Sequence, residues 1–235
     1  MIHLLNLFML SYMLPSAKQM PTILFFTGGN SLMPKDIYSN FLSKFKDKYN
    51  VEIIKNTNKD SETIIDQLFE YSTNDEIIPM GHSSGCTTLL NYCTKMKNIK
   101  KCILLDPVDN NLKKNDNYNF DSFLRINAEK SYKWKMGDNV FKNPLPKIPF
   151  IPFFNMDTSN FKNVTKVNLK DYGHCDILDT AFSNIMHNTF AEGNSDRNNL
   201  DNYHKLLYEI IDNYIIFFDL LNYILPLSTN IMIYY

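Results

Sequence analysis

The chain has 235 residues, which is enough for one domain with a sizeable core and too few for two comfortable ones. Its formal net charge is −1 and its 24 basic residues are scattered, so the sequence lacks the basic patch that nucleic-acid binding requires. We expect a single domain with no nucleic-acid partner.

The chain begins with an apolar run over residues 2–14. This run is shorter than a membrane span and no basic residue precedes it, although the Pro-Ser-Ala that follows loosely resembles a cleavage site. We interpret residues 1–20 as an N-terminal apolar extension, with a cleaved signal as the less favoured alternative, and residues 21–235 as the folded domain.

The cysteines show neither a C-x-x-C pair nor the spacing of metal ligands. They are Cys86, Cys93, Cys102 and Cys175. The sequence therefore predicts no zinc site and no disulfide framework. A reducing compartment fits this pattern slightly better, so we expect a cytoplasmic location, with secretion or membrane association left open.

Short apolar runs alternate with segments of helical periodicity, which is typical of an α/β fold with a mostly parallel sheet and helices on both faces. The predicted strands are residues 22–26, 51–55, 76–80, 101–105, 123–127 and 164–169. The predicted helices are residues 37–49, 61–71, 86–96, 177–187 and 206–225.

Two long connections, residues 107–121 and 131–163, interrupt this alternation. The second interleaves four prolines with apolar side chains between positions 144 and 154, which excludes a regular helix there. It is either a lid or wall of a substrate cleft, or a loop packed over the edge of the sheet.

The C-terminal run, residues 214–235, is apolar enough to suggest a membrane tail. Asp219 and Asn222 lie within it and Pro226 interrupts it. The apolar side chains before the proline recur at helical spacing on one face. We therefore expect a terminal helix that packs on the core and no stable membrane span.

The strongest local motif is Gly-His-Ser-Ser-Gly at residues 81–85, which joins the predicted strand 76–80 to the predicted helix that follows. A G-x-S-x-G between a strand and a helix places its serine on a sharp turn, where small flanking residues relieve crowding. The same turn directs backbone N–H groups at the reacting centre. The motif predicts Ser83 as a nucleophile.

A serine hydroxyl needs a base to remove its proton. The five histidines are His3, His82, His174, His187 and His204. His174 follows the last predicted strand on a short loop, whereas His82 adjoins the serine and is expected to point away from it, and the other three lie in apolar or helical segments. Position and elimination favour His174 as the base.

The base must be oriented by an acid. Asp106 directly follows the predicted strand 101–105, so its carboxylate is expected at the same sheet edge as Ser83. Glu129, after the next strand, is the rival. Asp171, Asp176 and Asp179 are close to His174 in sequence and are interpreted as loop charges or helix caps. We prefer Asp106 and leave Glu129 open.

An oxyanion formed on this serine would need preorganised N–H donors. The residue after the nucleophile, Ser84, supplies one in this kind of fold, and a loop after an early strand supplies the other. In this chain that loop is the turn at residues 27–30, and we predict Gly29 as the second donor.

Three motifs together resemble the chlorophyllase-like branch of the α/β-hydrolases: Gly-His-Ser-Ser-Gly at 81–85, Leu-Leu-Asp-Pro-Val-Asp at 104–109 and Lys-Asp-Tyr-Gly-His-Cys-Asp-Ile-Leu-Asp at 170–179. The resemblance covers roughly residues 21–225. It implies an α/β-hydrolase fold with a triad of Ser83, Asp106 and His174, and favours Asp106 over Glu129. Platelet-activating-factor acetylhydrolases and polyester-degrading hydrolases are more distantly similar.

These observations predict a serine hydrolase that cleaves a carboxylic ester through an acyl-enzyme and needs no cofactor. The apolar connection suggests a small-molecule ester with a hydrophobic acyl or alcohol part. Two alternatives remain: an inactive protein of this fold that binds a ligand or partner, and an acyltransferase that uses the same triad.

Overall fold

The computed structural model describes residues 20–29, 34–54, 76–93, 99–108, 122–136, 139–142, 164–189, 193–194, 196–224 and 231–234. The predicted helix 61–71, nearly all of the N-terminal extension and most of both long connections lie outside the described residues. The predictions made for them stay predictions.

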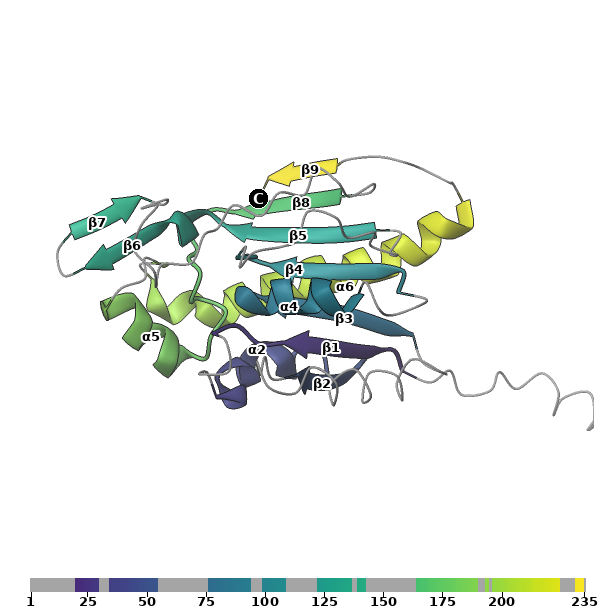
Figure 1. Ribbon diagram of the computed structural model, residues 1–235, viewed down its shortest axis with the longest axis horizontal. Helices are drawn as coiled ribbons and strands as arrows, with labels where there is room; N and C mark the ends of the chain where they lie inside the picture. Colours follow the sequence, from purple (N-terminus) through teal and green to yellow (C-terminus); the bar gives the residue numbers. More distant parts are fainter. Residues whose placement is uncertain are drawn as a thin grey trace, which may run out of the picture.

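A seven-stranded sheet, in which every neighbouring pair is parallel, forms the centre of the molecule (Figure 1). Its order is β2-β1-β3-β4-β5-β8-β9, with the bounds Asn50–Ile54, Thr22–Phe26, Ile77–His82, Lys101–Leu105, Ser122–Ala128, Val164–Leu169 and Ile231–Tyr234. All six predicted strands are present, with ends within two residues of the prediction.

Helices precede or follow the strands along the described chain. They are η1 (Lys35–Tyr38), α2 (Ser39–Ser43), α4 (Ser84–Cys93), η2 (Glu129–Tyr132), α5 (Thr180–Thr189), η3 (Arg197–Asn199) and α6 (Leu200–Ile224). The predicted helix 37–49 is shorter than expected, because α2 ends at Ser43 and a series of turns continues to Lys48.

Each face of the sheet carries its own hydrophobic core. Along β1, Ile23 and Phe25 join the cluster that contains residues of α2 and α6, whereas Leu24 and Phe26 join the cluster that contains residues of α4. A strand buried on both faces must be apolar throughout, which explains why β1 has no polar alternation. The result is the three-layer α/β-hydrolase type of fold, with the β3–α4 turn at its centre.

Two structural features were not predicted. A two-stranded antiparallel hairpin, β6 (Lys133–Met136) with β7 (Asn139–Lys142), lies within the connection expected to be irregular. Strand β9 lies beyond Pro226, where the sequence analysis predicted no element, and it pairs with β8 at the edge of the sheet.

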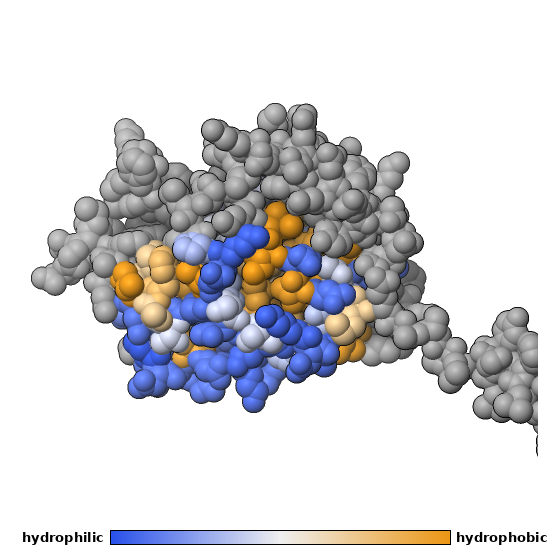
Figure 2. Space-filling model, turned by 90° about the horizontal axis from the view of Figure 1, so that it is seen from below, coloured by the Kyte–Doolittle hydropathy of each residue, from blue (hydrophilic) through white to orange (hydrophobic). Residues whose placement is uncertain are grey.

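The other edge of the described sheet is β2, where Val51 and Ile53 are only partly buried. Figure 2 views the molecule from below the orientation of Figure 1 and shows apolar side chains gathered in the middle of this face, among hydrophilic ones. Edge strand β2 therefore contributes less completely buried apolar surface than the central strands β1 and β3.

Helix α6 packs one face on the core, as the periodicity predicts, and begins six residues earlier than expected. Tyr203, Leu207, Ile211 and Ile215 are buried on this face, whereas Phe217 is exposed. Within the part of the chain that the structure describes, no helix has the length and hydropathy to cross a membrane.

The turn between β3 and α4 is tightly packed against β1. A Cβ atom added to Gly85 would lie 2.3 Å from the carbonyl oxygen of Phe26 and 2.6 Å from that of Thr27. At Gly81 it would lie 3.0 Å from the Cα atom of Cys86. Gly85, the second glycine of the motif, is therefore required, because backbone atoms of β1 and Thr27 occupy the space that its side chain would need.

Gly85→Ala is expected to lower the free energy of unfolding by about 2–3 kcal/mol, because neither carbonyl can move without disturbing β1. Urea unfolding followed by circular dichroism would measure this loss. The matched control is Thr88→Ala, one turn further along α4 at a partly exposed position, where we expect a change within about 0.5 kcal/mol. Equal effects at the two positions would contradict the close packing.

Candidate active site

Ser83 lies directly after β3 in a left-handed backbone conformation, with φ 56°. This conformation is strained for a residue with a side chain and persists only where the surroundings impose it. The Ser83 amide donates to the carbonyl of Leu105 (3.1 Å), and the Ser83 carbonyl accepts from the amides of Cys86 (3.0 Å) and Val108 (3.3 Å). These three bonds fix the turn on both sides of the serine.

Asp106 repeats the same arrangement one strand further along the sheet. It directly follows β4, has φ 46° and donates its amide to the carbonyl of Ile126 on β5 (2.7 Å). Because β3 and β4 are parallel neighbours, with His82 paired to Leu105, the two strained residues extend from the same edge of the sheet.

His174 connects these two side chains. Its Nε2 lies 2.9 Å from Ser83 Oγ and its Nδ1 lies 2.6 Å from Asp106 Oδ2. A carboxylate only accepts hydrogen bonds, so Nδ1 carries the proton in the neutral ring and Nε2 faces the serine as an acceptor. All three residues are buried, with exposed fractions of 7–8%.

The carboxylate of Asp106 is held by two further donors. Its Oδ1 accepts from the Ala128 amide (3.1 Å), and its Oδ2 accepts from the Ser131 hydroxyl. Ser131 belongs to η2 and was not recognised in the sequence, because only the fold brings this helix to the end of β4.

Glu129, the rival acid, lies elsewhere. Its Oε2 accepts a long hydrogen bond of 3.4 Å from the Asp171 amide. Of the two candidate acids, Asp106 therefore contacts the His174 ring, whereas Glu129 contacts the backbone of Asp171, two residues after the end of β8.

The two predicted oxyanion donors lie beside each other. Gly29 has φ 77°, a conformation that favours glycine, and its amide donates to Ser84 Oγ at 3.0 Å. Ser84 is the first residue of α4, where backbone N–H groups have no acceptor within the helix. The Ser84 side chain thus links the loop after β1 to the start of α4.

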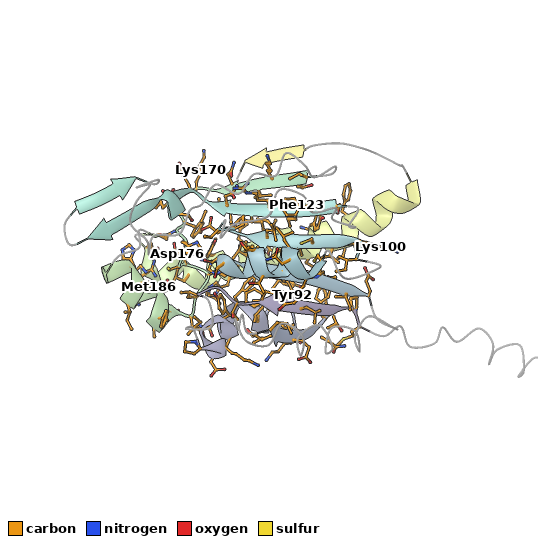
Figure 3. All side chains as sticks on the ribbon, viewed as in Figure 1. Tyr92, Lys100, Phe123, Lys170, Asp176 and Met186 are labelled. Carbon is orange, nitrogen blue, oxygen red and sulfur yellow. The ribbon has the colours of Figure 1, made fainter. Side chains whose placement is uncertain are left out.

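Asp176 was expected to be a loop charge or a helix cap, and the structure corrects this expectation. Its side chain is 2% exposed and accepts from the amides of Gly173 (2.8 Å) and Asn194 (2.7 Å) and from the Arg197 guanidinium (2.6 Å). An anion buried this deeply needs such partners, and here they close the loop that carries His174. Figure 3 labels Asp176 near α5, and Lys100 near the opposite end of the sheet.

The two other acids near His174 behave as predicted. Asp179 accepts from the Asn40 amide (2.8 Å) and the Ser39 hydroxyl (2.5 Å) at the start of α2. Asp171 is an exposed charge, with Nζ of Lys130 at 3.5 Å. Asp179 also donates its amide to the carbonyl of Ile37, so the end of the His174 loop is attached to α2 and η1.

Two other histidines hold the same loop. His82 Nε2 lies 3.1 Å from the carbonyl oxygen of His174, and His204 Nε2 lies 3.1 Å from that of Asp176. Burial lowers the pKa of both rings, that of His82 well below its ordinary value. His82 points toward the His174 backbone, and its ring centroid lies 4.7 Å from that of His174.

The four cysteines are buried free thiols. Among the residues that the structure describes, no group of three or more His, Cys, Asp or Glu side chains is arranged to hold a metal ion.

No protein-family model matches the chain, and no curated protein sequence matches it. Among solved structures, a protein named as a YdeN-like hydrolase from Pectobacterium atrosepticum is similar at 11% identity and a TM-score of 0.43, over 86% of this chain and 97% of that chain. An esterase domain from a Rhodothermus marinus protein is similar at 8% identity and a TM-score of 0.42, over 81% and 88%.

Titration of the buried histidines predicts how stability depends on pH. Burial lowers the pKa of His204 in the folded protein, whereas the unfolded chain binds a proton near pH 6.5. The free energy of unfolding is therefore expected to be fully retained above about pH 6.5 and to fall below it, by up to about 1.4 kcal/mol per pH unit for each such histidine. Urea unfolding between pH 7.5 and 5.5 would measure this dependence.

The control is His204→Gln, whose amide can donate to the same carbonyl of Asp176 but does not titrate. We expect its stability to fall less steeply with decreasing pH than that of the wild type. Identical slopes in the two proteins would contradict a neutral, buried His204.

Proposed function

We propose that the protein is a serine hydrolase that cleaves a carboxylic ester. The observation that carries the proposal is the continuous line from Ser83 Oγ through His174 to the carboxylate of Asp106, with bonds of 2.9 and 2.6 Å. This is the arrangement that activates a serine hydroxyl, and it lies where two residues hold strained backbone conformations.

In the proposed reaction, Ser83 Oγ attacks the ester carbonyl carbon while its proton passes to Nε2 of His174. Asp106 stabilises the imidazolium through the bond to Nδ1. As the tetrahedral intermediate collapses, the bond to the alcohol oxygen breaks and that oxygen takes the proton from Nε2. Water then attacks the acyl-enzyme with His174 as base, which releases the acid and returns the proton to Ser83.

The oxyanion of the intermediate is proposed to bind the amides of Ser84 and Gly29. The Gly29 amide donates to Ser84 Oγ, so this hydroxyl holds the second proposed donor in place. When the oxyanion forms, the Gly29 amide is shared between the two oxygens or leaves the hydroxyl.

The proposed substrate is a small-molecule ester with a hydrophobic acyl or alcohol part. This part of the proposal depends on the sequence of residues 144–154, where prolines alternate with apolar side chains, and these residues lie outside the described part of the chain. The chlorophyllase-like resemblance is consistent with such a substrate, and the branch of the superfamily stays a prediction.

The proposal predicts that a fluorophosphonate probe labels the wild type, because the activated serine attacks phosphorus as it attacks an ester carbonyl. Ser83→Ala is expected to take up no probe and to cleave no ester in a panel of increasing acyl chain length. His174→Ala is expected to lose nearly all labelling. Probe uptake that persists in Ser83→Ala would sink the proposal, and a folded wild type without uptake or cleavage would favour a binding protein.

The two candidate acids supply a matched pair within this experiment. Asp106→Asn is expected to lower kcat roughly a thousandfold or more, because the amide no longer selects the tautomer with the proton on Nδ1. Glu129→Gln is expected to change kcat by about twofold or less, since its carboxylate accepts from the Asp171 amide and not from the His174 ring, whose Nδ1 donates to Asp106. The opposite ranking would show that Asp106 is not the acid.

A further inference from the structure

A buried hydrogen-bonded line runs behind the proposed triad. The Gly28 amide donates to Tyr38 Oη at 3.1 Å, Tyr38 Oη lies 2.9 Å from His82 Nδ1, and His82 Nε2 lies 3.1 Å from the carbonyl oxygen of His174. Tyr38 is 1% exposed and His82 is 3% exposed. The line therefore joins the loop after β1, the end of β3 and the loop after β8 inside the protein.

Chemistry fixes the direction of every bond in this line. An amide N–H only donates, so Tyr38 Oη accepts from Gly28. A carbonyl only accepts, so His82 Nε2 must carry its proton toward His174. In a neutral imidazole the other nitrogen is then the acceptor, and the Tyr38 hydroxyl donates to it. Each polar atom of the two side chains is thus matched by a complementary partner.

Electrostatics agrees with this assignment. Burial lowers the pKa of His82 and raises that of Tyr38, so both side chains are neutral near pH 7. The thiols of Cys86 and Cys175 are close enough to interact electrostatically with Tyr38. Burial raises the pKa values of both thiols, so they are neutral as well. His174 is therefore the group beside His82 that gains a charge in the proposed reaction.

We propose that Tyr38 and His82 are positioning residues, which hold the base His174 and the backbone before Gly29 in the geometry that the reaction needs. The inference rests on the proposed function. Neither side chain is assigned a contact with substrate. His82 acts through the His174 carbonyl, and Tyr38 acts through His82 and the Gly28 amide.

Two physical reasons support a role in catalysis beyond packing. First, a displacement of about 1 Å in a catalytic group can lower a rate a hundredfold. The hydrogen-bonded line constrains two proposed groups at once, the base His174 and the backbone before Gly29. Second, the rings of His82 and His174 lie 4.7 Å apart, so a positive His82 would oppose the imidazolium that forms on His174. Burial and the neighbouring His174 lower the pKa of His82, and the Tyr38 hydroxyl donates to the unprotonated Nδ1 of the neutral ring.

The first test compares Tyr38→Phe with Tyr49→Phe. Both changes remove one buried phenol hydroxyl, but Tyr49 Oη donates to Asp212 of α6 at 2.8 Å and takes no part in the line. We expect Tyr38→Phe to lower kcat for an aryl ester, and the rate of fluorophosphonate labelling, by about tenfold or more, with KM changed less than about twofold. Tyr49→Phe is expected to keep the wild-type kcat.

The second test asks whether a neutral donor replaces His82. In His82→Gln the side-chain amide can still donate to the His174 carbonyl, whereas in His82→Leu it cannot. We expect His82→Gln to retain a kcat at least about tenfold above that of His82→Leu. Circular dichroism and unfolding midpoints of all variants restrict the comparison to folded protein.

Equal kcat values for Tyr38→Phe and Tyr49→Phe would overturn the inference, as would equal kcat values for the two His82 variants. Histidine ¹⁵N NMR provides a readout that needs no activity: His82 is expected to carry its proton on Nε2 alone between pH 6 and 8. An imidazolium or the other tautomer would refute the line itself. Wild-type protein with this tautomer but without ester cleavage or labelling would instead refute the proposed function.

Discussion

Parallel pairing of β3 with β4 is the constraint on which the rest of the site depends. The register pairs His82 with Leu105, so Ser83 and Asp106 are the next residues on adjacent strands, and each turns away from the sheet with a positive φ. A shift of one residue would move each side chain to the opposite face of the sheet. Hydrogen bonds to the next strand also stabilise the strained conformations. The Ser83 amide donates to the carbonyl of Leu105 on β4, and the Asp106 amide donates to that of Ile126 on β5.

The proposed base, His174, lies in contrast on a loop, and its position must come from other contacts. The loop after β8 is attached at four places: His82 and His204 donate to its carbonyls, Asp176 closes it through Arg197, and Asp179 binds the start of α2. These attachments come from β3, from the chain around η3 and α6, and from α2. A loop attached on so many sides can hold a ring as firmly as a strand would, which a catalytic base requires.

Much of this arrangement follows from local sequence, and the remainder does not. Strands β1, β3 and β4 were predictable because burial on both faces makes them mostly apolar, and the β3–α4 turn was predictable because Gly81 and Gly85 leave room where backbone passes. The β6–β7 hairpin was missed although Gly-Asp at 137–138 separates two short runs, which is a hairpin pattern. Strand β9 was missed because a short apolar run beside a long helix resembles its continuation. Ser131 and Tyr38 acquire their roles only through contacts between segments distant in sequence.

Contacts between segments distant in sequence also give the buried histidines of this site different surroundings. His82, His174 and His204 are all buried, but the groups that accept the proton of each ring differ. The rings of His82 and His204 donate to backbone carbonyls, and burial lowers the pKa of both rings, which disfavours a positive charge on them. The ring of His174 donates instead to the carboxylate of Asp106 and presents Nε2 to Ser83 Oγ, which is the arrangement that the proposed base requires. Sequence position suggested which histidine to propose as the base, and the carboxylate beside the His174 ring is a physical reason for that proposal.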